Sequence, residues 1–305
     1  SELGGGTIGV VSLNSIASLE LRYLLQEAYG LEPGGADELL SVTLVESPAE
    51  SLPDLLVEGE LEAGLTSPQG AFGLRNDDAV RVLADVTTEV RDLTGGPIAH
   101  SILLTYPDVA GQKSAGLVEL NRMLMESMSY FRANQDPVIV ALGEQLDVEP
   151  GFMRWWWDRY ELLMGELTQD AQDQIVNIWE VAFAVGDIEE VPEIASLLFQ
   201  PADLDPEVDG DRTTVSIAVL DDPGRRAALY AIEQGIVTSS AIDLDISYLA
   251  QTALTEAAAA KQYDVVEASP LAVPLSVERD LDFLILSAAL QNLDGTLLFV
   301  RDGDG

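Results

Sequence analysis

A repeated order of strand and helix patterns is the feature that most limits what this chain can fold into. Residues 7–11 form a short apolar strand pattern, which a polar loop and an amphipathic helix ending at Gly30 follow. The same order begins again at residues 215–219 and reaches a helix that ends at Gly235. Strands that alternate with helices predict a mostly parallel sheet in each half of the chain.

A Ser-Pro pair after the third strand pattern of each half strengthens the case for a repeat. Ser67 and Ser269 begin the two pairs and lie 202 positions apart (269 − 67). We therefore expect an α/β fold with two Rossmann-like lobes and a ligand cleft between them. The expected divisions are a lobe over 1–95, a middle region over 96–211, and a second lobe with a hinge strand over 212–305.

The middle region combines connections with a helical segment. Residues 112–200 carry helical periodicity, and a polar linker follows at 205–211. Two strand-like segments, 98–106 and 296–301, are each preceded by glycine and are expected to connect the lobes. Glycine at such positions suits a hinge.

Charge excludes several kinds of partner. The chain has 53 Asp and Glu against 15 Lys and Arg, a formal net charge of −38. This charge argues against nucleic acid and anionic membrane surfaces as partners. A halophilic, salt-adapted surface and an ordinary acidic protein both fit the composition. No apolar run reaches the roughly 18 residues of a membrane span, so no stable membrane insertion is expected.

Residue types that commonly carry catalysis or metal are scarce. The chain has no cysteine and a single histidine, His100, which lies in an apolar strand pattern and is expected to be packed there. Disulfides, thiolate nucleophiles and His-rich zinc sites are therefore excluded. No EF-hand, phosphate-binding loop or dinucleotide motif occurs. We expect no cofactor, no metal and no catalytic residue.

The candidate ligand-binding residues of the first lobe follow its first and third strands. Ligands bind at the carboxyl ends of strands in open α/β sheets. Leu13, Asn14 and Ser15 precede a helix whose free N–H groups attract an anion, although a plain helix cap is the alternative. Thr66 and Ser67 offer hydroxyls to a small ligand, or form only a turn before a proline.

The candidates of the second lobe occupy the matching positions. Asp221, Arg225 and Ser269 are expected to face the cleft, whereas Asp222 is expected to cap the helix. Positive charge in the first turn of a helix opposes its dipole, so Arg225 needs a reason to be there. An anionic ligand is one reason, and pairing of Arg225 and Arg226 with the two aspartates is the other.

Several segments resemble one family of proteins. The openings VVSLNSIASLELRYLLQEAYG and AVLDDPGRRAALYAIEQG, the strand ends GELEAGLTSPQGA and QYDVVEASPLAV, and the helical stretch YPDVAGQKSAGLVELNRMLMESMSYFRANQDPVIVAL resemble the nitrate/sulfonate/taurine-type solute-binding proteins of ABC transporters. The resemblance spans nearly the whole chain and implies the type II periplasmic binding protein fold. The order differs: 1–95 resembles the family's second lobe and 212–293 its first, which predicts a circular permutation joined through 302–305 and 1–4.

The resemblance implies a function without covalent chemistry. We expect a monomeric solute-binding protein that captures a small, anionic solute for an ABC permease. One alternative is an enzyme similar to those menaquinone-pathway enzymes that share this fold and act on chorismate-derived substrates. A ligand-sensing domain is the other. The family implies an extracytoplasmic or cell-surface location, and a cytoplasmic one follows if no signal peptide precedes Ser1.

Overall fold

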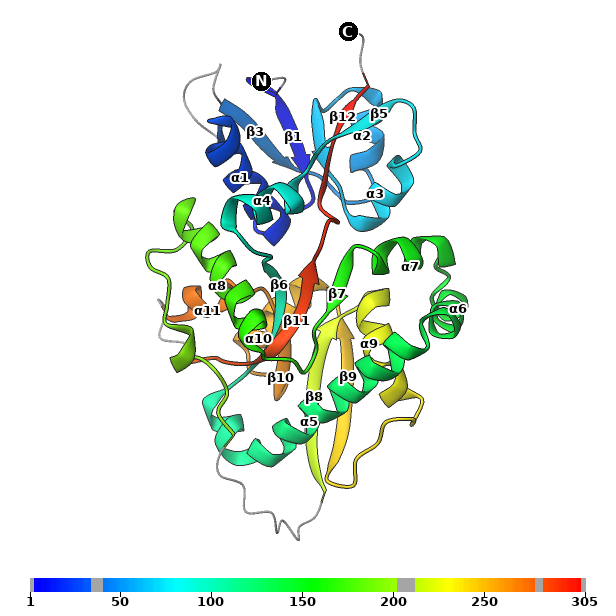
Figure 1. The fold of residues 1–305 in the computed structure, drawn as a ribbon, viewed down its shortest axis with the longest axis vertical. Coiled ribbons are helices and arrows are strands. Elements are labelled where there is room, and N and C mark those ends of the chain that lie inside the picture. Colours follow the sequence, from blue (N-terminus) through cyan, green and yellow to red (C-terminus); the bar gives the residue numbers. More distant parts are fainter. Residues whose placement is uncertain (1–2, 34–40, 202–211, 278–281, 303–305) are drawn as a thin grey trace.

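Two six-stranded sheets organise the chain, one in each lobe (Figure 1). The structure, a computed structural model, describes residues 3–33, 41–201, 212–277 and 282–302. The polar linker expected at 205–211 and the terminal residues of the proposed permutation joint, 1–2 and 303–305, lie outside these residues. Among the described helices, none is both long and apolar enough to cross a bilayer.

The sheet of the first lobe has the order β2-β3-β1-β4-β12-β5. β1, β3 and β4 pair in parallel, and β12 pairs antiparallel with both β4 and β5. The last described strand of the chain therefore belongs to the first lobe. The strands of this sheet are β1 (Thr7–Val10), β2 (Glu32–Pro33), β3 (Ser41–Glu46), β4 (Ala63–Leu65), β5 (Val80–Asp85) and β12 (Leu297–Arg301).

The sheet of the second lobe has the order β7-β11-β6-β10-β8-β9. β8, β9 and β10 pair in parallel, and β6 pairs antiparallel with both β10 and β11. Its strands are β6 (Ala99–Thr105), β7 (Tyr160–Leu162), β8 (Thr213–Leu220), β9 (Ile242–Leu249), β10 (Val265–Ala268) and β11 (Leu284–Asn292).

Apart from one edge strand each, the two sheets repeat a single strand order. β3-β1-β4-β12-β5 corresponds to β9-β8-β10-β6-β11, with the antiparallel strand in the fourth place of both. The α/β fold with two related lobes, predicted from the repeat, is confirmed. Circular permutation stays a prediction, because lobes with one strand order do not reveal which of them came first.

Eleven α-helices occur in the described part of the chain. Four of them, together with the short strand β7, form the helical segment that the sequence predicted between the lobes. These four are α5 (Pro107–Ala133), α6 (Gln135–Leu146), α7 (Pro150–Trp157) and α8 (Gln169–Ala184). The others are α1 (Ile16–Tyr29), α2 (Leu52–Glu58), α3 (Pro68–Leu74), α4 (Val86–Thr94), α9 (Pro223–Glu233), α10 (Gln251–Ala259) and α11 (Ala272–Val277).

Local chemistry explains where the first helix of each lobe begins. The Ser15 hydroxyl accepts from the Ser18 N–H at 3.1 Å, and an Asp222 carboxylate oxygen accepts from the Arg225 N–H at 2.7 Å. Both side chains thereby satisfy an N–H that the helix leaves unpaired. At the other end of α1, Gly30 has a φ of 61°, a left-handed conformation that glycine adopts without strain.

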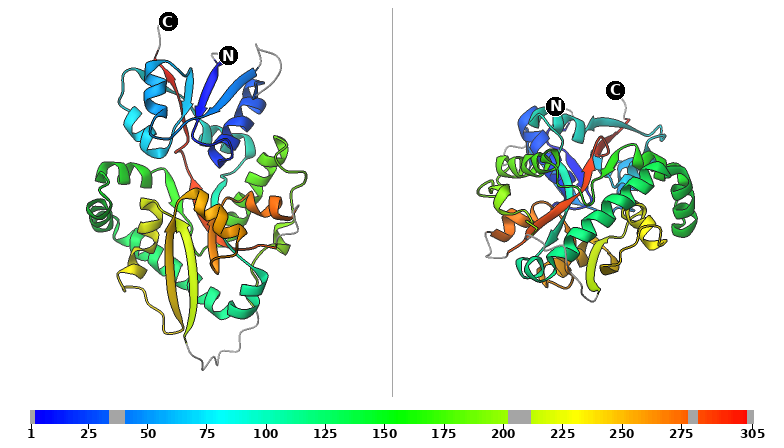
Figure 2. Two further views of the ribbon diagram at one scale, coloured as in Figure 1. Left: turned by 180° about the vertical axis from the view of Figure 1, so that it is seen from behind. Right: turned by 60° about the horizontal axis from the view of Figure 1, so that its bottom comes forward.

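Helix α8 packs at the boundary between the lobes (Figures 1 and 2). Its buried Ile175, Ile178 and Trp179 belong to one apolar core that also contains Leu19 of α1 and Ile102 of β6. The core is therefore continuous across the boundary. Both chain ends lie at the outer end of the first lobe, away from this boundary (Figure 2).

Gly224, in the first turn of α9, is covered by the ring of Trp156 from α7. A Cβ atom at Gly224 would overlap the Trp156 ring, whereas a Cβ atom at Gly73 in α3 would meet nothing within 4 Å. We predict that Gly224→Ala lowers the free energy of unfolding by about 1–3 kcal/mol, the usual cost of overpacking.

The control for Gly224→Ala is Gly73→Ala, which should leave stability unchanged or raise it by up to about 1 kcal/mol because alanine favours helix. Urea unfolding in molar salt measures both variants. Equal effects of the two substitutions would contradict the packing of Trp156 on α9.

Candidate functional site

Apart from β6, β7 and β12, the strands of both sheets direct their carboxyl ends toward the other lobe. β11 ends where the chain leaves for β12, and β8, β9 and β10 run in the same direction as β11. β12 begins at this junction and runs opposite to β4 and β5, so the first sheet presents its carboxyl ends to the second lobe. The loops predicted to hold a ligand therefore face one another across the boundary (Figure 1).

The loop after β1 carries Leu13, Asn14 and Ser15. Ser15 caps α1, so the capping alternative considered for this loop is observed, and its hydroxyl is engaged. Asn14 and Leu13 are exposed, and the Leu13 N–H donates to a Glu46 carboxylate at 2.7 Å. The exposed carboxamide of Asn14 is the group of this loop that is best placed to meet a solute.

The loop after β4 carries Thr66 and Ser67. The Ser67 hydroxyl caps α3 by accepting from the Gly70 N–H at 3.2 Å. The Thr66 hydroxyl oxygen is buried and has no hydrogen-bond partner among the described residues. A buried hydroxyl without a partner costs free energy, commonly about 1–3 kcal/mol. It is therefore the clearest vacant hydrogen-bonding group at the carboxyl edge of the first sheet.

Arg225 in the second lobe is a buried ion rather than an exposed one. It is 3% exposed, and its guanidinium contacts the Asp222 carboxylate at 2.6 Å and Glu267 of β10 at 3.0 Å. It also donates to the Ser101 hydroxyl at 3.1 Å. Of the two explanations for Arg225, pairing with carboxylates is the one observed, and Glu267 is a partner that the sequence did not reveal.

Burial and charge act in opposite directions on these carboxyl groups. Burial alone would raise the pKa of Glu267, but the adjacent Arg225 guanidinium holds it below its ordinary value. For Asp222, burial dominates and raises the pKa in spite of Arg225. The Arg225 guanidinium therefore outweighs the effect of burial on the pKa of Glu267 but not on that of Asp222.

Asp221 and Ser269 lie at the same edge. Asp221 is exposed and pairs with Arg226 at 2.9 Å, and Arg226 also lies over the Tyr248 ring at 3.9 Å. The Ser269 hydroxyl accepts from the Leu271 N–H at 3.3 Å. Both arginines of this edge are therefore balanced by three carboxylates.

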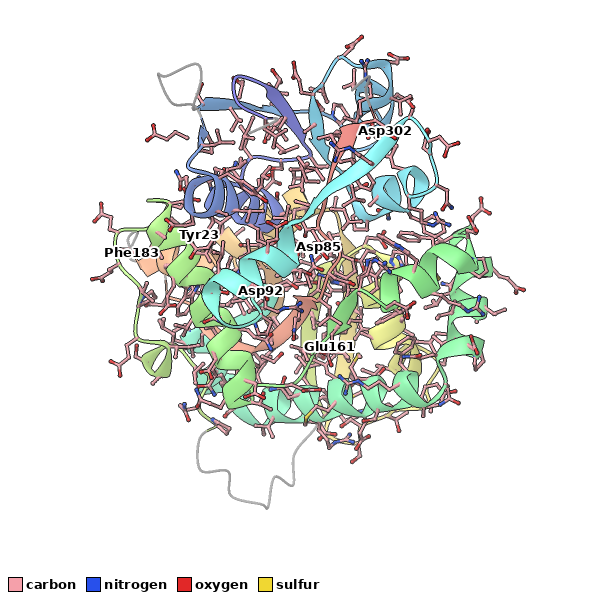
Figure 3. The ribbon with its side chains drawn as sticks, turned by 45° about the horizontal axis from the view of Figure 1, so that its top comes forward. Tyr23, Asp85, Asp92, Glu161, Phe183 and Asp302 are labelled. Atoms are coloured by element: carbon pink, nitrogen blue, oxygen red, sulfur yellow. The ribbon has the colours of Figure 1, made fainter. Side chains whose placement is uncertain are left out.

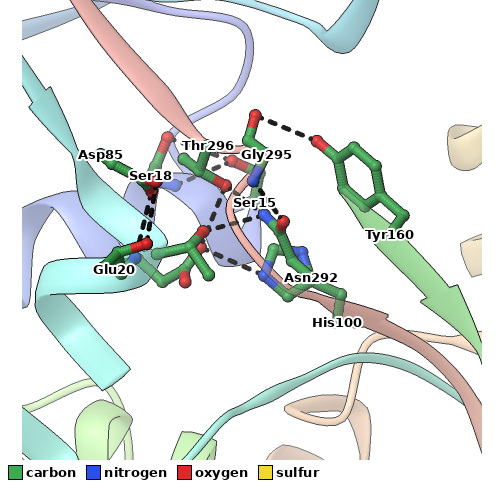
Figure 4. A network of polar contacts seen from close by, with 11 residues as sticks. Ser15, Ser18, Glu20, Asp85, His100, Tyr160, Asn292, Gly295 and Thr296 are labelled. Atoms are coloured by element: carbon green, nitrogen blue, oxygen red, sulfur yellow. Dashed lines mark hydrogen bonds and ion pairs between the residues drawn. The ribbon is translucent and has the colours of Figure 1, made fainter. Parts of the chain in front are cut away.

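A buried polar cluster joins the lobes at the junction (Figure 4). His100 of β6 lies 3.2 Å from a carboxylate oxygen of Glu20 in α1, a side chain with no exposed surface. The same Glu20 oxygen accepts from Thr296 at 3.4 Å, and the Asn292 carboxamide donates to Thr296 at 2.6 Å and to Thr87 at 2.9 Å. As expected from the sequence, His100 is packed, but its partner belongs to the other lobe.

Glu20 and Asn292 are the residues of this junction that sequence reasoning missed. Glu20 lies between Leu19 and Leu21 in the chain, and no local sequence pattern predicts a buried carboxylate at this position. Asn292 precedes Gly295 by three residues and accepts from its N–H at 2.7 Å, which is a turn signal in the sequence but not a sign of contacts across lobes.

Aromatic side chains form a second bridge between the lobes. Phe72 of α3 lies with its ring centre 5.5 Å from Phe152 and 5.8 Å from Trp155, both of α7. Trp156 stacks on Tyr160, whose hydroxyl donates to the Gly295 carbonyl at 3.2 Å. The aromatic run at 155–157 therefore serves mostly for packing.

A cavity of about 490 Å³ lies beside the first connection rather than between the strand ends. Gly95, Gly96 and Pro97 of the connection and Asp170 and Asn177 of α8 are among its lining residues. Within the described ranges, no three His, Asp or Glu side chains come together as a cation site.

Comparisons with known proteins give likeness of structure only. No family model and no curated protein matches the sequence. Among solved structures, the periplasmic aliphatic sulphonate binding protein SsuA from Escherichia coli is 10% identical, with a TM-score of 0.34 over 96% of this chain and 64% of that one. The ancestral amino acid-binding protein AncCDT-1 is 8% identical, with a TM-score of 0.36 over 99% and 83%.

A binding protein component of an ABC phosphonate transporter from Pseudomonas aeruginosa is 9% identical, with a TM-score of 0.35 over 98% of this chain and 69% of that one. The fold assignment rests on the strand order of the chain itself, and no conclusion about the ligand is taken from these likenesses.

The buried pair gives a stability prediction. Glu267→Gln keeps the shape of the side chain but leaves Arg225 with Asp222 as its one carboxylate. We expect the free energy of unfolding at pH 7 to fall by about 3 kcal/mol, because loss of a buried ionic partner costs roughly 3–5 kcal/mol. The difference should shrink in acid, since a carboxyl with a lowered pKa stabilises the fold above its unfolded pKa and loses this effect as pH falls through its folded pKa.

The control for Glu267→Gln is Asp221→Asn, which removes an exposed pair and should cost less than about 1 kcal/mol. Denaturant unfolding between pH 3 and pH 7 measures both variants. Equal losses in the two variants at pH 7 would contradict the burial of Arg225.

Asp294, in the connection to β12, gives a prediction of opposite sign. Burial raises the pKa of Asp294, and the nearby Arg159 and Arg91 offset only part of this rise. The unfolded chain therefore ionises Asp294 first as pH rises, which costs folded-state stability above that range. Asp294→Asn should raise the free energy of unfolding at pH 7 and leave it unchanged near pH 2.5. Asp92→Asn, at an exposed site of α4, controls for the general loss of one negative charge. A gain no larger than that of Asp92→Asn would refute the role of burial.

Proposed function

We propose that this chain is a solute-binding protein that holds a small polar solute between its two lobes. The observation that carries the proposal is the facing of the carboxyl edges of two sheets with the same strand order. Two connections join the lobes, one from α4 to β6 and one from β11 to β12. Lobes joined by hinges of this kind close around ligands. Delivery of the solute to an ABC permease belongs to the same proposal.

The residues proposed to contact the solute come from both edges. In the first lobe they are Asn14, Thr66 and the first turn of α1, with Leu13, Ser15 and Ser67 shaping the loops. The N–H groups of Ile16 and Ala17 have no partner within the helix and carry the positive end of its dipole. Asp221 and Ser269 form the second edge, which the buried Arg225 supports through its contacts with Asp222 and Glu267.

The charges at these edges favour a zwitterionic or uncharged solute over a simple anion. The helix end in the first lobe suits a carboxylate or another negative group. The second lobe has two arginines against Asp221, Asp222 and Glu267, so its surplus charge is negative. The anion expected from the sequence would meet Arg225 only together with the carboxylates that already neutralise it.

A ligand screen tests the proposal. Thermal shifts in molar salt, with amino acids, sulfonates, nitrate, carboxylates, pyrimidines and chorismate-like acids, should find a solute that raises the melting temperature. A ligand at a hundred times its Kd stabilises by about 2.7 kcal/mol. Mass spectrometry of the recovered solute follows: an unchanged solute supports binding, and conversion would instead support the enzyme alternative.

Thr66→Val separates a binding role from a structural one. Removing a buried hydroxyl without a partner should raise the free energy of unfolding of the ligand-free protein by about 1 kcal/mol. The same change should weaken the screened solute about fivefold or more, the value of roughly one hydrogen bond.

The matched control for Thr66→Val is Thr214→Val, at the opposite end of β8, which should leave the affinity unchanged. Titration calorimetry measures affinity, and urea unfolding measures stability. Unchanged affinity in Thr66→Val, with the solute still bound, would remove Thr66 from the site.

A further inference from the structure

A buried carboxylate and the only histidine of the chain meet where the two lobes join. Glu20 belongs to α1 of the first lobe, and His100 belongs to β6 in the sheet of the second lobe. The Glu20 Oε2 and His100 Nε2 atoms are 3.2 Å apart, and the two side chains are 0% and 12% exposed. Within the described ranges, His100 is the only basic side chain that pairs with Glu20. The Glu20 carboxylate therefore depends on His100 for a counter-charge.

Neutral hydrogen-bond donors do not replace that counter-charge. Glu20 Oε1 and His100 Nε2 are buried, and neither has a hydrogen-bond partner among the described residues. Glu20 Oε2 accepts one long hydrogen bond from Thr296 at 3.4 Å. A buried carboxylate needs donors or a cation to offset its lost hydration. The buried charges balance when Glu20 is ionised and His100 is protonated.

The other acidic groups of this junction cannot balance a negative charge on Glu20. Asp85, at the start of α4 in Figure 3, caps this helix by accepting from the Thr88 N–H at 3.1 Å. Burial, and then the charges of Glu20 and Asp294, raise the pKa of Tyr160, so this phenol keeps its proton.

The arginines near the junction are engaged elsewhere. Arg225 donates to Ser101 of β6 at 3.1 Å, but two carboxylates already hold it. Arg91 and Arg159 act on the connection between β11 and β12. Helix α8, which packs against both α1 and β6, buries no charged side chain. His100 is therefore the one group of the described junction that can bring a positive charge to Glu20.

Both connections between the lobes reach this pair. His100 is the second residue of β6, where the first connection ends. Thr296, which contacts Glu20, immediately precedes β12, where the second connection ends. A change of charge at this point therefore acts on both hinges.

We propose that a proton on His100 joins the two lobes, and that its release to solvent in alkaline solution weakens the junction. In the protonated state, an imidazolium faces the Glu20 carboxylate in a buried site, where attraction is stronger than in water. Release of the proton leaves Glu20 as a buried anion without a counter-charge, which is the costly state. Histidine is the side chain that ordinarily changes charge between pH 5 and pH 8. No solute takes part, so this inference is independent of the proposed function.

A double-mutant cycle at two pH values tests the proposal. Glu20→Gln, His100→Gln and the double variant each keep a polar side chain at the substituted positions. Urea unfolding in molar salt should give a coupling of about tenfold or more in the unfolding equilibrium constant at pH 6. The coupling should be about fivefold or more smaller at pH 9, because the imidazolium is lost. Equal coupling at the two pH values would overturn the proposal.

The matched control is Glu27→Gln, at an exposed site of the same helix. Its cycle with His100→Gln should show no coupling at either pH. Circular dichroism establishes that each variant is folded before stabilities are compared. A coupling as large for Glu27 as for Glu20 would show that the general negative charge of the chain, and not the pair, is responsible.

A second measurement needs no substitution of the pair. Because His100 is the only histidine, its imidazole signal in NMR reports the loss of the proton directly. Spin labels on cysteines introduced at the exposed Gln69 and Ala250 report the distance between the lobes. Without solute, the distance distribution should broaden over the pH range in which the imidazole signal changes. A distribution that stays unchanged while His100 loses its proton, or that broadens in another pH range, would overturn the proposal.

Discussion

Each sheet contains one strand that the chain delivers from the opposite lobe, and this exchange constrains the rest of the molecule. β6 follows α4 of the first lobe and inserts antiparallel between β10 and β11, while β12 follows β11 and inserts between β4 and β5. Because both insertions start at the junction, both sheets must turn their carboxyl ends toward it. The facing loops, the buried contact of Glu20 with His100 and the connection at Asn292 all follow from that single arrangement.

The carboxyl edge of the second lobe pairs its positive charges closely, although the chain as a whole is strongly negative. The chain has a net charge of −38, and at the carboxyl edge of the second lobe both arginines are held by carboxylates. A buried ion such as Arg225 is stable only with partners that offset the loss of hydration. Its role is therefore to fix β10, α9 and β6 relative to one another, through Glu267, Asp222 and Ser101. The proposed solute would meet an edge whose surplus charge is negative.

Local sequence chemistry predicted the repeated fold and the helix starts, because strand periodicity, caps at Ser15 and Asp222 and the glycines are properties of neighbouring residues. It also offered pairing as one explanation of Arg225. The contacts that sequence reasoning could not supply are distant in the chain: Glu267 is 42 residues from Arg225, and the Thr296 contact to Glu20 spans 276 residues. The order of the strands in the sheets brings such residues together, and the periodicity of a short stretch of sequence carries no information about these contacts.

A distance measurement across the junction tests the proposed binding site between the two lobes most directly. The chain has no cysteine, so cysteines introduced at Gln69 in α3 and at Ala250 after β9, both exposed, carry spin labels at two defined positions. Pulsed electron resonance then gives the distance distribution with and without the solute that thermal shift identifies. Binding between the lobes should shift and narrow this distribution. A solute that stabilises the protein and leaves the distribution unchanged would show that the lobes do not close on it.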